Sequence, residues 1–295
     1  MAAMIRIGIS GWRYAPWRGL FCPDKLTQAR ELQYASRTFP AIEINGTFYA
    51  LQTPASFEKW AQDTPGNFEF TVKAPKYITH TRRLAEPELP IANFMALGIF
   101  VLGNKLGPVL WQLPPGMRFD AVRCEAFLRL LPHTASECAA VASKREERMQ
   151  DKELVEPVAG LRMRHAVEVR NASFVDPAFI ALLRKYKVAL VIADTGGRWP
   201  EFEDLTADFV YLRLHGASEL YASGYSDKQL NHWAARIHQW SQGGQAPDAR
   251  LVSDVPPAKA AQREVFCFFD NTMKIEAPNN ARRLMQKLGL PERPV

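Results

Sequence analysis

Charged side chains that alternate with apolar ones in short runs are the residues of this sequence most suited to chemistry. A carboxylate and a histidine can act as general base and general acid, and an arginine can hold a carboxylate or phosphate through two parallel hydrogen bonds. Such residues recur in these runs, at Glu43, Lys73, Glu168, Arg170, Arg213 and His215. The set predicts acid–base catalysis on a small anionic substrate.

We assign catalytic roles to three of these residues. Glu168 is the expected general base, His215 its proton partner, and Glu43 a second carboxylate. Arg170 and Arg213 would hold the anionic group of the substrate. The other side chains expected to bind substrate are Lys73, Asn45, Trp12, Tyr49, His80, Gln112, Asp194 and Asn271. The substrate would be a polar molecule such as a phosphate- or carboxylate-bearing sugar derivative.

The same charges also allow a structural role. A buried charge is tolerated when it is paired, so these residues would then form a compensated ionic core without chemistry. Lys73 has two interpretations of its own: it would form a Schiff base if its pKa were lowered, but we favour an ion pair with Glu43. The aromatic residues of 12–21, 48–49 and 221–225 would either stack on a ring or sugar, or pack as a cap.

Repeated apolar runs, most followed by a helical pattern, indicate β-α units and a parallel sheet. We expect strands at 5–10, 41–45, 69–73, 108–113, 166–170, 189–194, 209–215 and 265–270. Eight such strands match a closed (β/α)8 barrel of the TIM type, formed by one domain over 1–295.

Helices are expected between most of these strands, to form the outer ring of the barrel. Their predicted ranges are 27–36, 55–62, 91–103, 121–131, 177–185, 227–242 and 279–287. Thr53, Asp176 and Ser226 precede three of them as capping residues. Two stretches interrupt the pattern and are interpreted as insertions, 133–164 with an extra helix near 136–147, and 243–259, which is rich in Pro, Gly and Ala.

The alternation within each strand predicts which side chains share a face. In a barrel strand, alternate side chains point to the helices and to the interior. The isoleucines of 5–10 and 42–45 would face the helices, which leaves Arg6, Glu43 and Asn45 inside. The polar residues lie mostly at the carboxyl ends of the strands, where barrel enzymes carry their active sites.

Composition restricts the partners. Thirty-seven Lys and Arg against 31 Asp and Glu give a net charge of +6, which favours anionic partners. The basic residues are dispersed, so nucleic-acid binding, or a metal-dependent endonuclease-like barrel, is the less favoured alternative. No run of about 20 apolar residues is present to cross a membrane. Four scattered cysteines and an N-terminus without a signal-peptide pattern predict a cytoplasmic protein with free thiols.

Cofactor and metal motifs give no support for a bound group. The G-x-G-x-x-G and G-x-x-x-x-G-K-[ST] patterns and the H-E-x-x-H metal motif are all absent. Carboxylates and histidines at several strand ends could meet around a metal, but the cations beside them would repel it. We therefore predict no cofactor and no metal. A Ser or Cys hydrolase is also disfavoured, because G-x-S-x-G is missing.

The sequence resembles the YecE-like family, known as domain of unknown function 72, over nearly its whole length. The motifs that carry the resemblance are Gly8-Ile9-Ser10-Gly11-Trp12, Glu43-x-Asn45-x-Thr47-Phe48-Tyr49, Gln112-Leu113-Pro114-Pro115, Glu168-Val169-Arg170 and Tyr211-Leu212-Arg213-Leu214-His215-Gly216. Lys73 and Thr79-His80 belong to the same pattern, whereas Phe269-Asp270-Asn271 departs from it. The resemblance implies a β/α barrel with a polar mouth and no established reaction.

Overall fold

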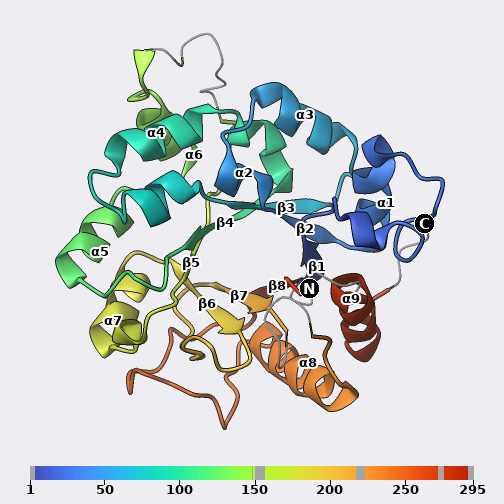
Figure 1. Ribbon diagram of the computed structural model, residues 1–295. Coiled ribbons are helices and arrows are strands. Elements are labelled where there is room, and N and C mark those ends of the chain that lie inside the picture. The colour runs from blue at the N-terminus through green and yellow to red at the C-terminus, as the bar shows by residue number, and fades with distance from the viewer. Residues whose placement is uncertain (1–3, 148, 150–156, 217–222, 272–275, 292–295) are drawn as a thin grey trace.

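The computed structural model describes residues 4–147, 149, 157–216, 223–271 and 276–291 (Figure 1). Its eight strands pair in parallel, each with the next along the chain, and β8 pairs with β1 to close the barrel. The strands are β1 (Ile5–Ser10), β2 (Ala41–Ile44), β3 (Glu69–Lys73), β4 (Leu106–Gln112), β5 (His165–Glu168), β6 (Ala189–Asp194), β7 (Phe209–Leu214) and β8 (Glu264–Phe269). The predicted TIM-like barrel is confirmed, with strand ends that differ by at most two residues.

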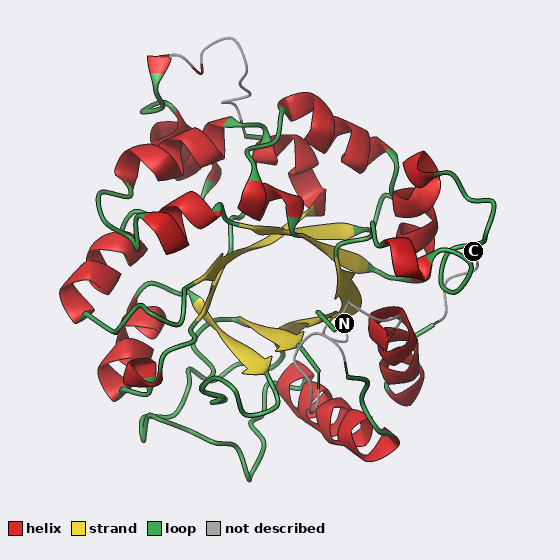
Figure 2. Cartoon of the chain, in the orientation of Figure 1, coloured by secondary structure: helices red, strands yellow, loops and turns green. Residues whose placement is uncertain are grey.

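The helices lie around the barrel, as Figure 2 shows. They are α1 (Glu31–Thr38), α2 (Gly46–Tyr49), α3 (Pro54–Gln62), α4 (Glu88–Ala96), α5 (Ala121–Leu128), α6 (Ala135–Ala142), α7 (Pro177–Lys185), α8 (Asp227–Ser241) and α9 (Glu276–Lys287). Thr53, Asp176 and Ser226 cap α3, α7 and α8 with their side chains, as predicted. Within the predicted insertion 133–164, α6 is the expected extra helix, although shorter than predicted.

The helix predicted over 91–103 is divided in the structure. It ends at Ala96, and a separate 3-10 segment, η4 (Ile99–Lys105), follows. Gly98 separates them with φ of 95°, a conformation in which a helix cannot continue. A side chain at this position would also meet Pro54 of α3, whose Cα would lie 2.6 Å from the added Cβ.

Alternate side chains of the strands enter two separate apolar layers. The outward layer, between strands and helices, includes Ile7, Ile9, Ile42, Ile44 and Val72. The inward layer is Ala41, Leu110, Ala166, Ala189, Val191, Ala193, Phe209, Tyr211, Phe266 and Phe268. The predicted alternation is confirmed, and the apolar inward layer separates two sets of charged residues at the two ends of the barrel.

Gly8 shows how closely two strands approach inside the barrel. A Cβ at this position would lie 2.1 Å from the carbonyl oxygen of Ala41 on β2. Only glycine fits such an approach. The nearest interior side chain is Phe268, which occupies the space that a residue at position 8 would otherwise fill.

No helix connects β6 to β7. The connection, 195–208, buries Phe202 and Leu205 against the outward layer. Residues from the stretch after α8 cover it: Glu203 N donates to Arg250 O at 2.8 Å, and Asp204 accepts from the backbone N–H of Val252 and Ser253. The predicted insertion 243–259 therefore takes the place of a helix in the outer ring, where Figure 2 shows loops between α7 and α8.

The N-terminal end of the barrel is closed by a ring of four alternating charges. Arg6 and Arg164 each contact both Glu69 and Glu264, with Arg6 Nε 3.2 Å from Glu264 and Arg164 Nη2 3.1 Å from Glu69. The Arg164 guanidinium also lies 4.9 Å from the ring centre of Phe266. Every charge in this ring therefore has two opposite charges as partners.

The four cysteines are free and buried. Among the described residues, no helix is both long and apolar enough to span a lipid bilayer.

Candidate active site at the carboxyl ends of the strands

Arg213 on β7 is the centre of the charged cluster at the carboxyl ends of the strands. Its guanidinium donates to Glu43 from β2, Glu168 from β5 and Asp270 after β8, at 2.6–3.0 Å. The side chain has no exposed surface. Three carboxylates on different strands thus share one buried cation, which holds them in place across the barrel interior.

The Glu43 carboxylate is saturated with hydrogen-bond donors. One oxygen accepts from Ser10 at 2.9 Å and from Arg213 at 2.8 Å, and the other from Arg213 at 3.0 Å and the Tyr211 hydroxyl at 2.7 Å. Glu43 is fully buried. Glu43 is therefore a fixed negative charge. It does not contact a substrate directly and acts only through the residues that bond to it.

Glu168 is held in a similar way but lies next to the more exposed Arg170. Gln112 and Arg170 donate to Oε1 at 2.9 and 2.8 Å, and Arg213 donates to Oε2 at 2.6 Å. Burial alone would raise the pKa of Glu168, but the Arg170 and Arg213 cations outweigh it and hold this pKa well below the ordinary value. Glu168 is thus ionised and weakly basic.

His215 and Asp270 form a second contact within the cluster. His215 Nδ1 lies 3.0 Å from Asp270 Oδ2, and Nε2 lies 3.3 Å from an Arg213 nitrogen. Burial, followed by the charge of Arg213, lowers the pKa of His215. This fits a neutral ring with its proton on Nδ1, because a bare Nε2 can accept from the arginine.

Lys73, the last residue of β3, differs from these groups because it forms no ion pair with any described residue. Its Nζ lies 4.4 Å from the ring centre of Phe48, and its backbone carbonyl accepts from Thr47 at 2.6 Å. Burial, followed by the nearby Arg213 cation, lowers the pKa of Lys73 to about 8. The ion pair expected between Lys73 and Glu43 is not formed, since Arg213, Ser10 and Tyr211 occupy that carboxylate.

His80 and Asn45 lie at the edge of the cluster. The His80 ring is 5.0 Å from Phe48, and its Nδ1 is 2.9 Å from the Thr79 hydroxyl. Burial and the charges of Lys73 and Arg170 lower the pKa of His80 to about 4, so the ring is neutral. The Asn45 side-chain oxygen is buried without a hydrogen-bond partner among the described residues.

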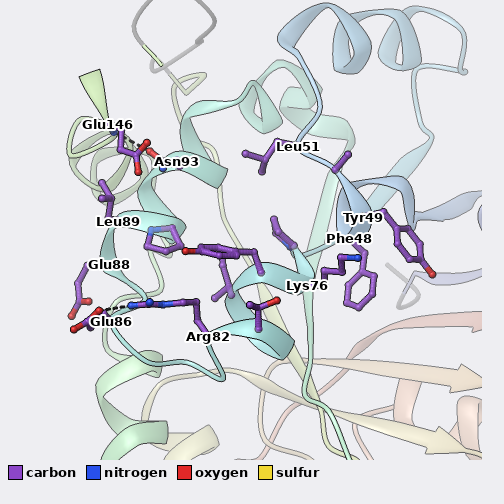
Figure 3. A pocket seen from close by; sticks show the side chains of 16 residues that line it. Phe48, Tyr49, Leu51, Lys76, Arg82, Glu86, Glu88, Leu89, Asn93 and Glu146 are labelled. Atoms are coloured by element: carbon purple, nitrogen blue, oxygen red, sulfur yellow. Dashed lines mark hydrogen bonds and ion pairs between the residues drawn. The ribbon is translucent and has the colours of Figure 1, made fainter. Parts of the chain in front are cut away.

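A pocket of about 760 Å³ lies beside the cluster, between α2 and α4 (Figure 3). Phe48 and Tyr49 stand on one side and Leu89 on the other. The chain between β3 and α4 contains a π-helical turn, η3 (Tyr77–Thr81), and three non-glycine residues with positive φ, Arg83, Leu84 and Glu86. Irregular helices and strained backbone of this kind are concentrated at functional sites. Phe48 belongs both to this pocket and to the surroundings of Lys73.

The remaining predicted site residues have separate places. Trp12 packs edge-on against Trp60 at 5.5 Å, in the layer outside the strands. Tyr49 is 71% exposed and lines the pocket. Asp194 accepts from Gly196 N and Trp233 Nε1, and Asn271 donates to Asn280. Tyr221 of the predicted aromatic roof lies outside the described residues.

Two participants, Tyr211 and Trp199, were not predicted from the sequence, and the role of a third, Asp270, was left open. Tyr211 shares the inward face with Arg213 two residues later, so the alternation could have revealed it. Asp270 ends the inward series of β8 and is a direct partner of Arg213. Trp199 lies in the β6–β7 connection, where no pattern marks it, and its ring centre is 3.8 Å from the Arg170 guanidinium.

The carboxylates of the cluster are engaged by arginines instead of converging on an open point. In the part of the chain that the structure describes, no group of three or more His, Cys, Asp or Glu side chains is arranged to hold a metal ion.

Comparisons with known proteins agree with the resemblance seen in the motifs. Residues 6–295 match the family described as protein of unknown function DUF72. UPF0759 protein YunF of Bacillus subtilis (strain 168) is 35% identical over 136 residues, 44% of this chain and 46% of that protein. UPF0759 protein YecE of Escherichia coli (strain K12) is 29% identical over 111 residues, 38% of each chain. The aligned regions thus span less than half of these relatives.

Solved structures match over nearly the whole chain. A DUF72 family protein of Thermotoga maritima MSB8 has a TM-score of 0.69 at 23% identity, covering 97% of this chain and 99% of that one. A DUF72 family protein of Enterococcus faecalis V583 has a TM-score of 0.67 at 17% identity, covering 99% of both. At these identities the likeness shows the fold alone.

Proposed function

The chain belongs to the DUF72 family, and we propose that it is an enzyme that performs acid–base chemistry on a small anionic polar substrate, such as a sugar derivative, at the carboxyl ends of its barrel strands. The single observation that carries this proposal is the placement of charge by depth. Glu43 and Glu168 are fully buried, whereas Lys73 and the Arg170 side chain each keep 9% of their surface exposed and the Asp270 side chain keeps 11%. A molecule that enters the mouth therefore meets two cations, Lys73 and Arg170, and one carboxylate, Asp270.

The geometry supports different roles for Arg213 on one side and for Arg170 and Lys73 on the other. The guanidinium of Arg213 already donates hydrogen bonds to three carboxylates. In this proposal Arg213 therefore positions these carboxylates and does not bind the anionic group of the substrate, the role that its residue type suggested. Arg170 and Lys73 are the cations that an anionic group would contact. Arg170 is oriented by its hydrogen bond to Glu168 and by stacking on Trp199, which prepares its planar fork for a carboxylate or phosphate.

Proton transfer near neutral pH falls to Lys73 in this proposal. A general acid or base works best when its pKa is close to the working pH. The pKa of Lys73, about 8, meets this condition, whereas Glu168 has a pKa well below its ordinary value. Glu168 and Asp270 then supply fixed negative charge beside the amine.

Calorimetric titration tests the anion-binding part of the proposal. We expect glycerol 3-phosphate to bind the wild-type protein and glycerol not to bind. Lys73→Met should weaken binding by at least about tenfold, the cost of one charged hydrogen bond. Arg164→Met, at the opposite end of the barrel, is the matched control and should bind as the wild type does. Equal binding by all three proteins would place the anion elsewhere.

Binding of nucleic-acid phosphates is a second candidate, favoured by a different observation. A hollow of about 870 Å³ near the N-terminal end of the barrel is lined by eight Lys and Arg residues and by two acidic residues, Glu137 and Asp208. Among the cations, Lys187 and Lys259 are exposed and form no ion pair with a described residue. Such a basic surface binds phosphates without sequence specificity.

Salt dependence distinguishes the two candidates. Fluorescence anisotropy with labelled single-stranded DNA should show affinity that falls steeply with added salt if the hollow is used. Lys187→Glu and Lys259→Glu should each lower the salt slope by about one, because each removes a phosphate contact. Lys73→Met should leave this slope unchanged. An affinity that does not respond to salt would exclude this candidate.

A further inference from the structure

We propose that Lys73 is a covalent catalytic residue whose amine forms an imine with the carbonyl carbon of an aldehyde or ketone that also carries a carboxylate or phosphate. The inference rests on the proposed function, because it uses the same mouth and the same anionic substrate. It adds the reactive group of the substrate and the bond that the enzyme makes to it.

The first support is the lack of a direct partner for the Lys73 amine. The cluster holds three carboxylates, and none of them forms an ion pair with Nζ. Glu43 and Glu168 receive donors from other residues at both carboxylate oxygens, and Asp270 Oδ2 contacts Arg213 and His215. Nζ lies 4.4 Å from the ring centre of Phe48, and an aromatic face attracts a cation without accepting a proton from it. An amine in these surroundings can lose its proton without breaking a salt bridge.

The second support is the protonation balance at neutral pH. A pKa of about 8 in place of 10.5 makes the neutral, nucleophilic fraction of Lys73 roughly 300 times larger than that of an ordinary lysine at pH about 7. The charges that set this balance are Arg213, which favours the neutral amine, and Asp270, Glu43 and Glu168, which favour the ammonium form. Schiff-base lysines are activated in this way, by desolvation and a neighbouring cation.

The proposed step is balanced without any oxidant or reductant. The Nζ lone pair attacks the carbonyl carbon, the C–N bond forms, and the electron pair of the C=O π bond moves to oxygen. The nitrogen then loses one proton and the oxygen gains one, which gives a neutral carbinolamine. The oxygen takes up a second proton, equivalent to the one that the ammonium form released, and leaves as water, while the nitrogen lone pair forms the C=N bond of an iminium. The iminium charge replaces the ammonium charge of Lys73, so the buried carboxylates keep the same net countercharge.

Arg170 supplies the specificity for the anionic group. It lies at the same mouth as Lys73, with its guanidinium stacked on Trp199 and its Nε bonded to Glu168. A substrate that binds Arg170 through a carboxylate or phosphate would present a nearby carbonyl carbon toward the amine. Small α-keto acids, α-aldehydo acids and phosphorylated hydroxy-carbonyl compounds have this combination of groups.

Reductive trapping tests the imine. The full chain is incubated near neutral pH with glyoxylate and sodium cyanoborohydride, which reduces an imine to a stable secondary amine, and the modified lysines are mapped by peptide mass spectrometry. Lys76 is the internal control, because it is exposed and lies three residues further along the chain. We expect modification of Lys73 to exceed that of Lys76 by at least about tenfold. Lys73→Arg, which keeps the charge but has no primary amine, should lose the excess labelling.

The outcomes separate this inference from the function on which it rests. If Lys73 is labelled no more than Lys76, the imine is excluded, while glycerol 3-phosphate titration still tests anion binding at the mouth independently. If the neutral aldehyde propanal labels Lys73 as readily as glyoxylate does, the imine is supported and the requirement for an anionic group is overturned. Selective labelling by glyoxylate alone supports both parts.

Discussion

The two ends of this barrel both bury charged side chains, but they balance them differently. At the N-terminal end, two arginines and two glutamates alternate in a ring, and each contacts two opposite charges. At the C-terminal end, Arg213 alone contacts three carboxylates, and Lys73 forms no ion pair with a described residue. In the first arrangement every charge has opposite charges as direct partners. In the second, the buried Lys73 cation has no direct ion-pair partner among the described residues.

This contrast shows that buried charge by itself does not identify a functional site. Alternation places Arg6 and Glu43 inside the barrel on the same grounds, yet the ring at the N-terminal end needs nothing further. The informative property is whether each charge has a direct partner. A buried cation without one costs stability, and this cost distinguishes Lys73 from the paired charges at both ends, which is why our proposal concerns Lys73.

The largest effect that we predict is from Arg213→Met. This change leaves Glu43, Glu168 and Asp270 buried without their common cation, and removing one partner of a buried ion pair costs about 3 to 5 kcal/mol. Urea denaturation at neutral pH measures the loss. A variant as stable as the wild type would mean that the carboxylates are balanced by other groups, and the contrast between the two ends would disappear.

Lys73→Met should have the opposite sign. Lowering the Lys73 pKa from 10.5 to about 8 corresponds to a destabilisation of up to about 3 kcal/mol at pH below 8, because the folded state disfavours the charged form. This cost disappears as pH rises from 8 to 10.5. Melting temperatures should therefore be higher for Lys73→Met than for the wild type at pH about 7, and should converge with it in alkali. A clearly destabilised variant would show that Lys73 is paired.

The pH dependence of two glutamates sharpens the comparison. Replacing Glu168 with Gln should cost about 2 kcal/mol at neutral pH. Because burial is outweighed by Arg170 and Arg213, the pKa of Glu168 is low, so its stabilisation is present above the ordinary pKa and is lost as pH falls through the lowered value.

At the other end, burial outweighs the arginines and raises the pKa of Glu69. The wild type should therefore lose stability, relative to Glu69→Gln, as pH rises through the raised pKa. Denaturation curves of both pairs between about pH 3 and 7 test the opposite slopes. Slopes of the same sign would contradict the assigned balance of burial and charge.

The smallest effect is expected from Arg164→Met at the N-terminal end. Arg6 still contacts both Glu69 and Glu264 in this variant, and the Arg164 side chain is already 16% exposed. Each glutamate thus keeps one arginine partner, so we expect a loss of about 1 kcal/mol, smaller than where a buried charge keeps no partner at all. Urea denaturation beside Arg213→Met gives the comparison directly, and equal losses would show that both ends depend on a single arginine.

The sequence allowed the barrel and its inward residues to be predicted because alternation is a local property. Glu43, Glu168 and Arg213 were all placed inside from their own strands. Which of them would meet was not predictable, since it depends on the stagger of strands that are distant along the chain. The expected pairing of Lys73 with Glu43 failed for this reason, because Arg213 reaches that carboxylate from β7, three strands away around the barrel.

Other parts of the site could not be predicted from the sequence, for different reasons. Asp270 stands where the family pattern is not followed, so its contact with Arg213 had no support from the motifs. Trp12 was assigned to the mouth with the aromatic loop, but it packs outside the strands, against Trp60 of α3. Trp12 lies two residues beyond the end of β1, so alternation does not place it, whereas Asp270 continues the inward series of β8 and only its partner was not predictable.

The missing helix between β6 and β7 has a consequence for the order in which the chain folds during synthesis. Phe202 and Leu205 complete the outer packing of these strands, and the segment that holds their connection in place, around Arg250 to Ser253, leaves the ribosome only after α8. Until then an emerging chain with seven strands carries a poorly covered seam, as well as an open edge that awaits β8. Proteins of this size fold through intermediates in which such surface is exposed. We therefore expect nascent chains to remain dependent on chaperones until the last fifth of the sequence has been made, and then to fold in one late step.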